Sequence, residues 1–441
     1  MAAVREIEMA SATQATSRPI IPQHVAETVI AAKSYADDAV IYDAFKWLRE
    51  NMPLGVAEVE GFDPMWIVTR HADIREVEKN AKLFHNADFN PVLNDRASDD
   101  FTREMTGGSV SGLASLTYMD PPVHQQYRML TANWFLPGKI GKLEDQIRVL
   151  AKQSVEHFLS FDGECDFVRD FALHYPLRVI MTLFGVPPED EPKMLKLTQE
   201  FFGGHDPEEQ RDEMKDDPVA AAKMWAAALE DFFQYFDALA EKRRAEPQDD
   251  LLTLIANSRI NGAPIGRDEA NGYFVAIATA GHDTTSSSVT GGMHGMIEFP
   301  ENFEKVKADP AMIPGLVDEA IRWTSPVKHF MRNATQDVEV GGQLIRSMDR
   351  LMMCYPSGNR DEAVFDDPDR FDITRSPNKH IAFGFGPHMC LGQHLAKLEM
   401  RILFEELMPH IASIELAGPP KLVEANFVGG YKSLPVRFRK A

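Results

Sequence analysis

Apolar residues recur at three- and four-residue spacing along most of the chain, which is the periodicity of an amphipathic helix. Strand-like stretches are short. Residues 54–70 hold two apolar runs around a Gly/Asp/Pro turn, and residues 337–346 predict a hairpin on Gly341-Gly342. The pattern therefore predicts a mainly α protein with small β-sheets. Helices are expected over residues 139–160, 187–202, 218–245, 267–298, 300–308, 311–324 and 390–409.

The stretch 267–298 would form a single helix about 45 Å long at 1.5 Å per residue. Its middle holds TAGHDTTSSS, residues 279–288, where a glycine, a carboxylate and a run of hydroxyl residues disfavour a regular helix. Two interpretations stand. The segment is a kinked helix whose hydroxyls are satisfied locally, or it is a functional site in which Asp283 and Thr284 relay protons into an apolar cavity.

Composition and charge narrow the class of protein. The 441 residues are 44% hydrophobic and 26% charged, as in an ordinary globular protein, and no linker-like segment divides them. We expect a loose N-terminal tail over residues 1–20 and a single domain over 21–441. Without a run of 18 apolar residues, a soluble, cytoplasmic protein with no membrane partner is expected. The net charge of −21 disfavours nucleic acid as a partner.

One of the three cysteines lies in an unusual setting. Cys390 belongs to FGFGPHMCLG, residues 383–392, whose glycines suit a loop that bends tightly. The residues that follow have helical spacing, so the thiol should lie at a helix N-terminus, where a thiolate is favoured. Such a thiolate is a metal ligand or a nucleophile. The alternative is a buried cysteine without chemical significance.

Two further pairs carry charge at helical spacing. His124 and Arg128 lie four residues apart after Pro121-Pro122, where they either grip an anion or face solvent. Glu319 and Arg322 lie three residues apart and can pair, with Arg370 as a second guanidinium for a structural clamp on the carboxylate.

In combination, the Cys390 loop, the Ala280-Gly281-x-Asp283-Thr284 helix centre and the Glu319-x-x-Arg322 pair resemble the cytochrome P450 superfamily of haem-thiolate monooxygenases. The resemblance covers nearly the whole chain and points to the soluble bacterial class. It implies the P450 fold as a single catalytic domain with haem b, iron protoporphyrin IX, as cofactor.

The resemblance also implies roles for individual residues. Cys390 would be the axial ligand of the haem iron, and Asp283 with Thr284 the pair that protonates bound O2. Phe383 would pack near the sulfur in the loop that Gly384 bends, and Glu319, Arg322 and Arg370 would form a structural triad. The residues implied to contact the haem propionates are His124, Arg128, Arg332 and His388. At position 388 many members carry arginine, and either side chain can donate to a propionate.

The implied reaction inserts one atom of O2 into a C–H bond of a small apolar substrate. The chain lacks a Rossmann or Walker glycine motif, so electrons are expected from a separate [2Fe–2S] ferredoxin with its NAD(P)H ferredoxin reductase. Arg128, Lys379 and Lys397 are expected to form a basic patch for that ferredoxin, and the protein is expected to be a monomer. Two alternatives are a haem-based ligand sensor and a peroxide-driven fatty-acid hydroxylase.

The substrate is expected to be a monoterpenoid such as terpineol, or an alkyl-aromatic or aromatic hydrocarbon. Ala276 and Thr279 precede Asp283 by seven and four residues and so share its helical face. Phe427 and Val428 match positions that contact substrate in the family. Residues 84–114, rich in Gly, Ser and Asn, are expected to form a mobile lid.

Overall fold

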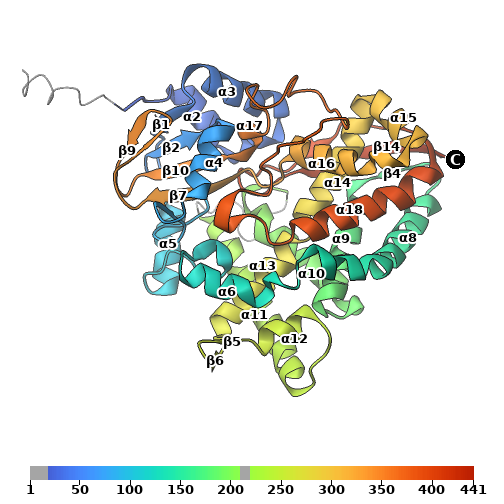
Figure 1. The fold of residues 1–441 in the computed structure, drawn as a ribbon, viewed down its shortest axis with the longest axis horizontal. Coiled ribbons are helices and arrows are strands. Elements are labelled where there is room, and N and C mark those ends of the chain that lie inside the picture. Colours follow the sequence, from blue (N-terminus) through green and yellow to red (C-terminus); the bar gives the residue numbers. More distant parts are fainter. Residues whose placement is uncertain (1–17, 209–218) are drawn as a thin grey trace, which may run out of the picture.

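Helices build most of the molecule, as the spacing of apolar residues predicts. The computed structural model describes residues 18–208 and 219–441 (Figure 1). The helices are α2 (Gln23–Ile30), α3 (Asp38–Asn51), α4 (His71–Lys79), α5 (Arg96–Thr106), α6 (Val123–Ala132), α7 (Pro137–Ile140), α8 (Glu144–Ser160), α9 (His174–Phe184), α10 (Glu191–Phe202), α11 (Ala220–Ala245), α12 (Leu251–Ala256), α13 (Arg267–Ala280), α14 (Asp283–Glu298), α15 (Pro300–Ala308), α16 (Ile313–Thr324), α17 (Tyr355–Gly358) and α18 (Gln393–Leu407).

The strands are short and gather mainly in two sheets. A five-stranded sheet runs in the order β1 (Leu54–Ala57), β2 (Met65–Val68), β10 (Arg350–Cys354), β7 (His329–Ala334) and β3 (Phe84–His85). A three-stranded sheet joins β11 (Ile411–Leu416), β14 (Pro435–Lys440) and β4 (Glu164–Asp166). Three two-stranded ribbons complete the strands: β5 (Arg259–Ile260) with β6 (Ala263–Pro264), β8 (Val338–Val340) with β9 (Gln343–Ile345), and β12 (Lys421–Leu422) with β13 (Tyr431–Ser433).

The larger sheet is buried on both faces because its side chains alternate between two apolar clusters. In β2, Met65 and Ile67 pack in one cluster with Met352, while Trp66 and Val68 pack in the other. The predicted hairpin over 337–346 is confirmed as β8 and β9, with Gly341 and Gly342 at φ +53° and +78° in its turn. These glycines adopt the left-handed backbone that other residues resist.

The main core lies among the helices on the other side of the molecule from this sheet (Figure 1). It holds α8, α9, α11, α13, α14, α16 and α18 together through buried aliphatic and phenylalanine side chains. α14 approaches α16 closely because Gly292 faces it: a Cβ at Gly292 would lie 2.9 Å from the Ala320 Cβ. This contact fixes α14, and with it the residues at its N-terminus.

The structure describes only the last residues of the expected N-terminal tail. The tail expected over 1–20 falls mainly on residues 1–17, which lie outside the described residues. Of its last residues, Arg18 pairs with Asp349 at 2.9 Å and Ile20 forms a β-bridge with Val56. Within the two described ranges, no helix combines the length and the apolar character needed to span a bilayer.

Candidate functional site

The long helix expected over 267–298 is wrong in one respect: the chain forms two helices, α13 and α14, separated by Gly281 and His282. The Gly281 backbone stays close to Ile180 of α9, since a Cβ there would lie 3.1 Å from Ile180 Cγ1. The break leaves Asp283 as the first residue of α14. The unusual run of residues 279–288 therefore interrupts the helix rather than only kinking it.

Asp283 and Thr284 lie at this break in different surroundings. The Oδ2 atom of Asp283 is buried without a hydrogen-bond partner in the described part of the chain. Burial raises the pKa of the Asp283 carboxyl, and the neighbouring His282 opposes that rise. The Thr284 hydroxyl donates to the Ala280 carbonyl at 2.7 Å, and Thr284 lines a cavity. A carboxyl with a raised pKa beside a hydroxyl at a cavity wall has the groups that a proton relay needs.

The Cys390 loop bends as its glycines predict. Gly384 and Gly386 have φ of +71° and +73°, and the Cys390 N–H donates to the Phe383 carbonyl at 2.8 Å. α18 begins at Gln393, so the thiol lies just before a helix N-terminus, as expected. From α6, Arg128 Nη2 donates to the Met389 carbonyl at 2.7 Å and fixes the loop from the other side.

The environment of Cys390 differs from that of the other two cysteines. Its side chain is accessible, whereas Cys354 is buried and Cys165 is partly buried. Although its residue surface is accessible, desolvation by the surrounding protein atoms leaves the pKa of the Cys390 thiol raised; the Gly392 N–H, the Arg128 cation and the Gln393 N–H each oppose that rise. For Cys165, burial and two aspartates raise the pKa to about 12. Of the three cysteines, Cys390 is thus the one whose thiolate form is favoured by nearby N–H donors and a cation.

His124 and His388 lie side by side, with ring centroids 4.0 Å apart. Burial together with the Arg128 and Arg332 cations lowers the pKa of His124 to about 4, and burial and the same cations lower that of His388 to about 2. Both rings are therefore neutral near pH 7. Nδ1 and Nε2 of His124 and Nε2 of His388 are buried without a partner among the residues described. Such orphaned groups beside two cations form a receptor for a carboxylate.

Arg332 reaches this region from β7 but is itself held in place. Its Nη2 lies 3.0 Å from Glu78 Oε1, and both side chains are buried. The Tyr355 hydroxyl donates to the same Glu78 oxygen at 2.5 Å. The Arg332 charge acts on both histidines while its position is set by Glu78 of α4.

The clamp on Glu319 is present, but its third member is not the one expected. Glu319 and Arg322 are fully buried and pair at 2.7 Å. The second guanidinium on Glu319 belongs to Arg375, with Nε 3.2 Å from Oε1. Arg370 instead points to Glu301, and only its backbone carbonyl joins the cluster by accepting from Arg322 at 3.1 Å. The Arg375 N–H donates to the Asp372 carbonyl at 3.3 Å in a local turn, and the Arg375 side chain reaches inward to Glu319.

The four residues expected at the substrate all line one cavity of about 210 Å³. Ala276 and Thr279 reach it from α13, while Phe427 and Val428 reach it from the segment before β13; Thr284 lines it as well. The predicted lid, residues 84–114, contributes part of the wall, with α5 inside it. Sequence reasoning missed the remaining aromatic wall, because no local pattern marks it: Tyr118, Phe201, Phe202, Trp225 and Phe330.

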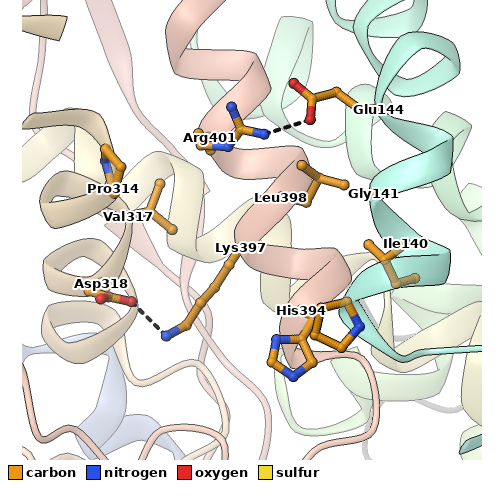
Figure 2. A pocket seen from close by; sticks show the side chains of 11 residues that line it. Ile140, Gly141, Glu144, Pro314, Val317, Asp318, His394, Lys397, Leu398 and Arg401 are labelled. Carbon is orange, nitrogen blue, oxygen red and sulfur yellow. Dashed lines mark hydrogen bonds and ion pairs between the residues drawn. The ribbon is translucent and has the colours of Figure 1, made fainter. Parts of the chain in front are cut away.

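A second hollow of about 360 Å³ lies between α7, α8, α16 and α18 (Figure 2). Its charges are paired: Lys397 with Asp318 at 2.7 Å and Arg401 with Glu144 at 3.0 Å. The basic patch expected from Arg128, Lys379 and Lys397 is therefore wrong in part. Lys397 is neutralised by Asp318, and Arg128 is half-buried on the Met389 carbonyl.

Comparison with known proteins decides the family. Residues 61–412 match the family model for Cytochrome P450. The chain is 55% identical over 426 residues to Cytochrome P450-terp of a Pseudomonas species, an alignment that covers 96% of this chain and all of the relative. The chain is a cytochrome P450.

Two further relatives support this membership of the P450 family. Linalool 8-monooxygenase of Pseudomonas putida is 32% identical over 90% of this P450 and 95% of its own length. The crystal structure of CYP108D1 from Novosphingobium aromaticivorans superposes with a TM-score of 0.89 at 41% identity, over 96% of this chain and all of that one. The predicted P450 fold in a single domain is thus confirmed.

Membership brings with it a cofactor and a reaction class. This P450 is a monooxygenase that uses haem and O2. The residues present fit a haem: an accessible thiol lies at a helix N-terminus, and the paired His124 and His388 lack the acceptor that a propionate carboxylate would supply. The alternative of a haem sensor without oxygenase activity is not supported.

Proposed function

We propose that this P450 hydroxylates a compact, uncharged monoterpenoid in the cavity lined by Ala276, Thr279, Phe427 and Val428. The observation that carries the proposal is the chemistry of the cavity wall. It is mostly apolar, and its described lining includes no lysine, arginine, aspartate or glutamate. Burial of apolar surface would then drive binding. A fatty acid would find no lysine or arginine for its carboxylate there, only neutral donors such as Asn94 and Ser98, which argues against a peroxide-driven fatty-acid hydroxylase.

The names of the relatives support the same class of substrate. Linalool 8-monooxygenase acts, by its name, on linalool, and the name of Cytochrome P450-terp indicates a terpenoid. We extend this class to the present chain, with terpineol as the first candidate and an aromatic hydrocarbon as the second. A cavity of about 210 Å³ suits a molecule of that size.

In this proposal the Cys390 sulfur would bind the haem iron, and His124, Arg128, Arg332 and His388 would hold the propionates. The haem, when bound, would supply the activation of O2 for C–H hydroxylation. The Gly392 and Gln393 N–H groups favour the Cys390 thiolate. Phe383 and Gly384 shape the loop around the sulfur.

The protons come through Asp283 and Thr284. Burial raises the pKa of the Asp283 carboxyl, which makes it a better proton carrier than an exposed carboxylate. The Thr284 hydroxyl lines the cavity and would accept a proton from this carboxyl and release it toward the cavity. The electrons are proposed to come from a [2Fe–2S] ferredoxin reduced by an NAD(P)H ferredoxin reductase. The P450 is proposed to act as a monomer, in a single domain that follows the N-terminal tail.

The substrate class is tested by spin-state titration of the ferric holoenzyme with α-terpineol, p-cymene, a polycyclic aromatic and laurate. We expect the largest shift and the tightest binding with α-terpineol, because it fits an apolar cavity of this volume. A strong shift with laurate and none with the other three compounds would overturn the proposal.

A matched pair of variants ties the shift to this cavity. Ala276→Phe, at the cavity wall, should weaken terpineol binding by about tenfold, equivalent to ~1.4 kcal/mol, through loss of space. Ala245→Phe, at the exposed end of α11, should leave the dissociation constant unchanged. Equal effects of the two substitutions would place the substrate elsewhere.

A further inference from the structure

His282 occupies the break between α13 and α14, and its side chain is completely buried. Its Nε2 lies 2.8 Å from the Leu173 carbonyl oxygen. Because a carbonyl oxygen only accepts, Nε2 carries a hydrogen and donates it. This bond anchors the imidazole to the segment that precedes α9, more than a hundred residues earlier in the chain.

The other ring nitrogen faces two groups at once. His282 Nδ1 lies 3.0 Å from Thr198 Oγ1 of α10 and 3.5 Å from Asp283 Oδ1. The Thr198 hydroxyl also lies 3.0 Å from the Leu195 carbonyl, yet it has one hydrogen to give. It donates either to Nδ1 of a neutral ring or to Leu195. In the second arrangement Nδ1 is left to face Asp283 Oδ1 alone.

Asp283 depends on this neighbour. Its Oδ2 has no partner among residues 18–208 and 219–441, and His282 is the neighbouring side chain that opposes the rise of its pKa by burial. The carboxyl is therefore positioned by the backbone of α14 and by the His282 ring. The ring in turn is positioned by Leu173 and by Thr198.

We infer that His282 is a positioning residue for this P450, which holds the Asp283 carboxyl in place and links it through Thr198 to α10. Phe201 and Phe202, in the last turn of α10, line the substrate cavity, so the link joins the cavity wall to the proton-donating carboxyl. The inference rests on the proposed role of Asp283 in proton delivery. It assigns His282 no contact with substrate or haem.

Two substitutions separate the two sides of the ring. His282→Asn places an amide near the position of Nδ1, facing Asp283 and Thr198. His282→Gln places an amide near the position of Nε2, facing Leu173. If His282 acts through Asp283, Gln should lower kcat by about tenfold, a part of the 10²–10⁴-fold that positioned proton transfer contributes, while Asn should retain most of the rate. The dissociation constant of the substrate, measured by spin-state titration, should change by less than about twofold in both variants.

The double variant His282→Gln/Asp283→Asn tests whether the two residues act as a unit. We expect it to be no slower than Asp283→Asn alone, because a positioning residue has nothing left to position. If the losses of kcat in His282→Gln and Asp283→Asn multiply in the double variant, the inference is overturned. It is also overturned if His282→Gln keeps the wild-type kcat, or if His282→Asn and His282→Gln lose kcat equally. Should Asp283→Asn itself turn over normally, the proposed proton route fails. If Asp283→Asn is slow and His282→Gln is not, the inference alone fails.

A measurement without turnover checks the same geometry. Nitrogen NMR of the holoenzyme labelled with ¹⁵N-histidine, in its diamagnetic carbon-monoxide form, should show His282 with a hydrogen on Nε2. Thr198→Val and Asp283→Asn should both move the Nδ1 resonance, since both face that atom. A neutral ring protonated only at Nδ1, or an Nδ1 resonance that neither substitution moves, would contradict the inference.

Discussion

Thr284 combines a local hydrogen bond with a place on the cavity wall. Its hydroxyl donates to the Ala280 carbonyl across the break between α13 and α14, which holds it at the cavity wall. Thr284→Ala is expected to leave substrate binding nearly unchanged but to lower the product formed per electron pair by about tenfold. Hydrogen peroxide should form instead, because no hydroxyl then positions the proton transfer. The measurement is product and peroxide per NAD(P)H consumed.

A matched control lies in the same helix. The buried Thr290 hydroxyl donates to the Ser286 carbonyl at 2.9 Å, in the same manner as Thr284, but Thr290 is outside the cavity lining. Thr290→Ala should keep the wild-type ratio of product to peroxide. If Thr284→Ala keeps it too, Thr284 has no part in proton delivery.

For single residues, the sequence predicted a role best where a reactive side chain is accompanied by a recognisable local sequence pattern. Cys390 is marked by its glycines, and Ala276 and Thr279 follow from helical spacing relative to Asp283. The partners of His282 could not be predicted, because Leu173 and Thr198 come from distant segments that only the packing of α9, α10 and α13 brings together. The same holds for Glu78, which positions Arg332 from another element.

At the scale of the elements, the hydrogen bonds to Glu319 of α16 lead to a prediction about stability. Glu319 accepts from Arg322, Arg375 and Asn378, and it is fully buried. Arg375→Ala removes one of these donors from a buried carboxylate and should lower the free energy of unfolding by about 1–3 kcal/mol. The midpoint of urea unfolding of the holoenzyme measures this loss.

Arg370→Ala is the natural control for that substitution. The Arg370 side chain forms an exposed pair with Glu301, and pairs of this kind contribute below about 1 kcal/mol. Its backbone carbonyl, which accepts from Arg322, survives the substitution. A larger loss in Arg370→Ala than in Arg375→Ala would restore the triad expected from the sequence.

Helix and strand positions were predictable from periodicity, but the ends of elements were less so. The hairpin β8–β9 and the strands β1 and β2 follow from alternation and glycine turns. The single helix over 267–298 was wrong because spacing alone does not show that Gly281 and His282 leave the helix. In the Asp- and Pro-rich loop at 365–375, the path of the backbone decides which arginine faces inward, and no periodicity encodes it.

For the whole molecule, two regions far apart in the chain converge on one chemistry. The helical core holds α14 against α16 and α18, which brings the Asp283–Thr284 break and the Cys390 loop into one body (Figure 1). The chain carries a net charge of −21, and Lys397 and Arg401 of α18, the helix that follows the Cys390 loop, are both paired with acids. Length and composition predicted one domain, but they do not determine this convergence.

The central claim, that Cys390 is the thiolate ligand of the haem, is tested most directly by the carbon-monoxide difference spectrum of the reduced protein. The wild type and the Cys354→Ala and Cys165→Ala variants should give the long-wavelength band that a thiolate opposite carbon monoxide produces. Cys390→His, which keeps a ligand atom at the same position, should bind haem without that band. Survival of the band in Cys390→His, or its loss in Cys354→Ala with haem still bound, would contradict the account.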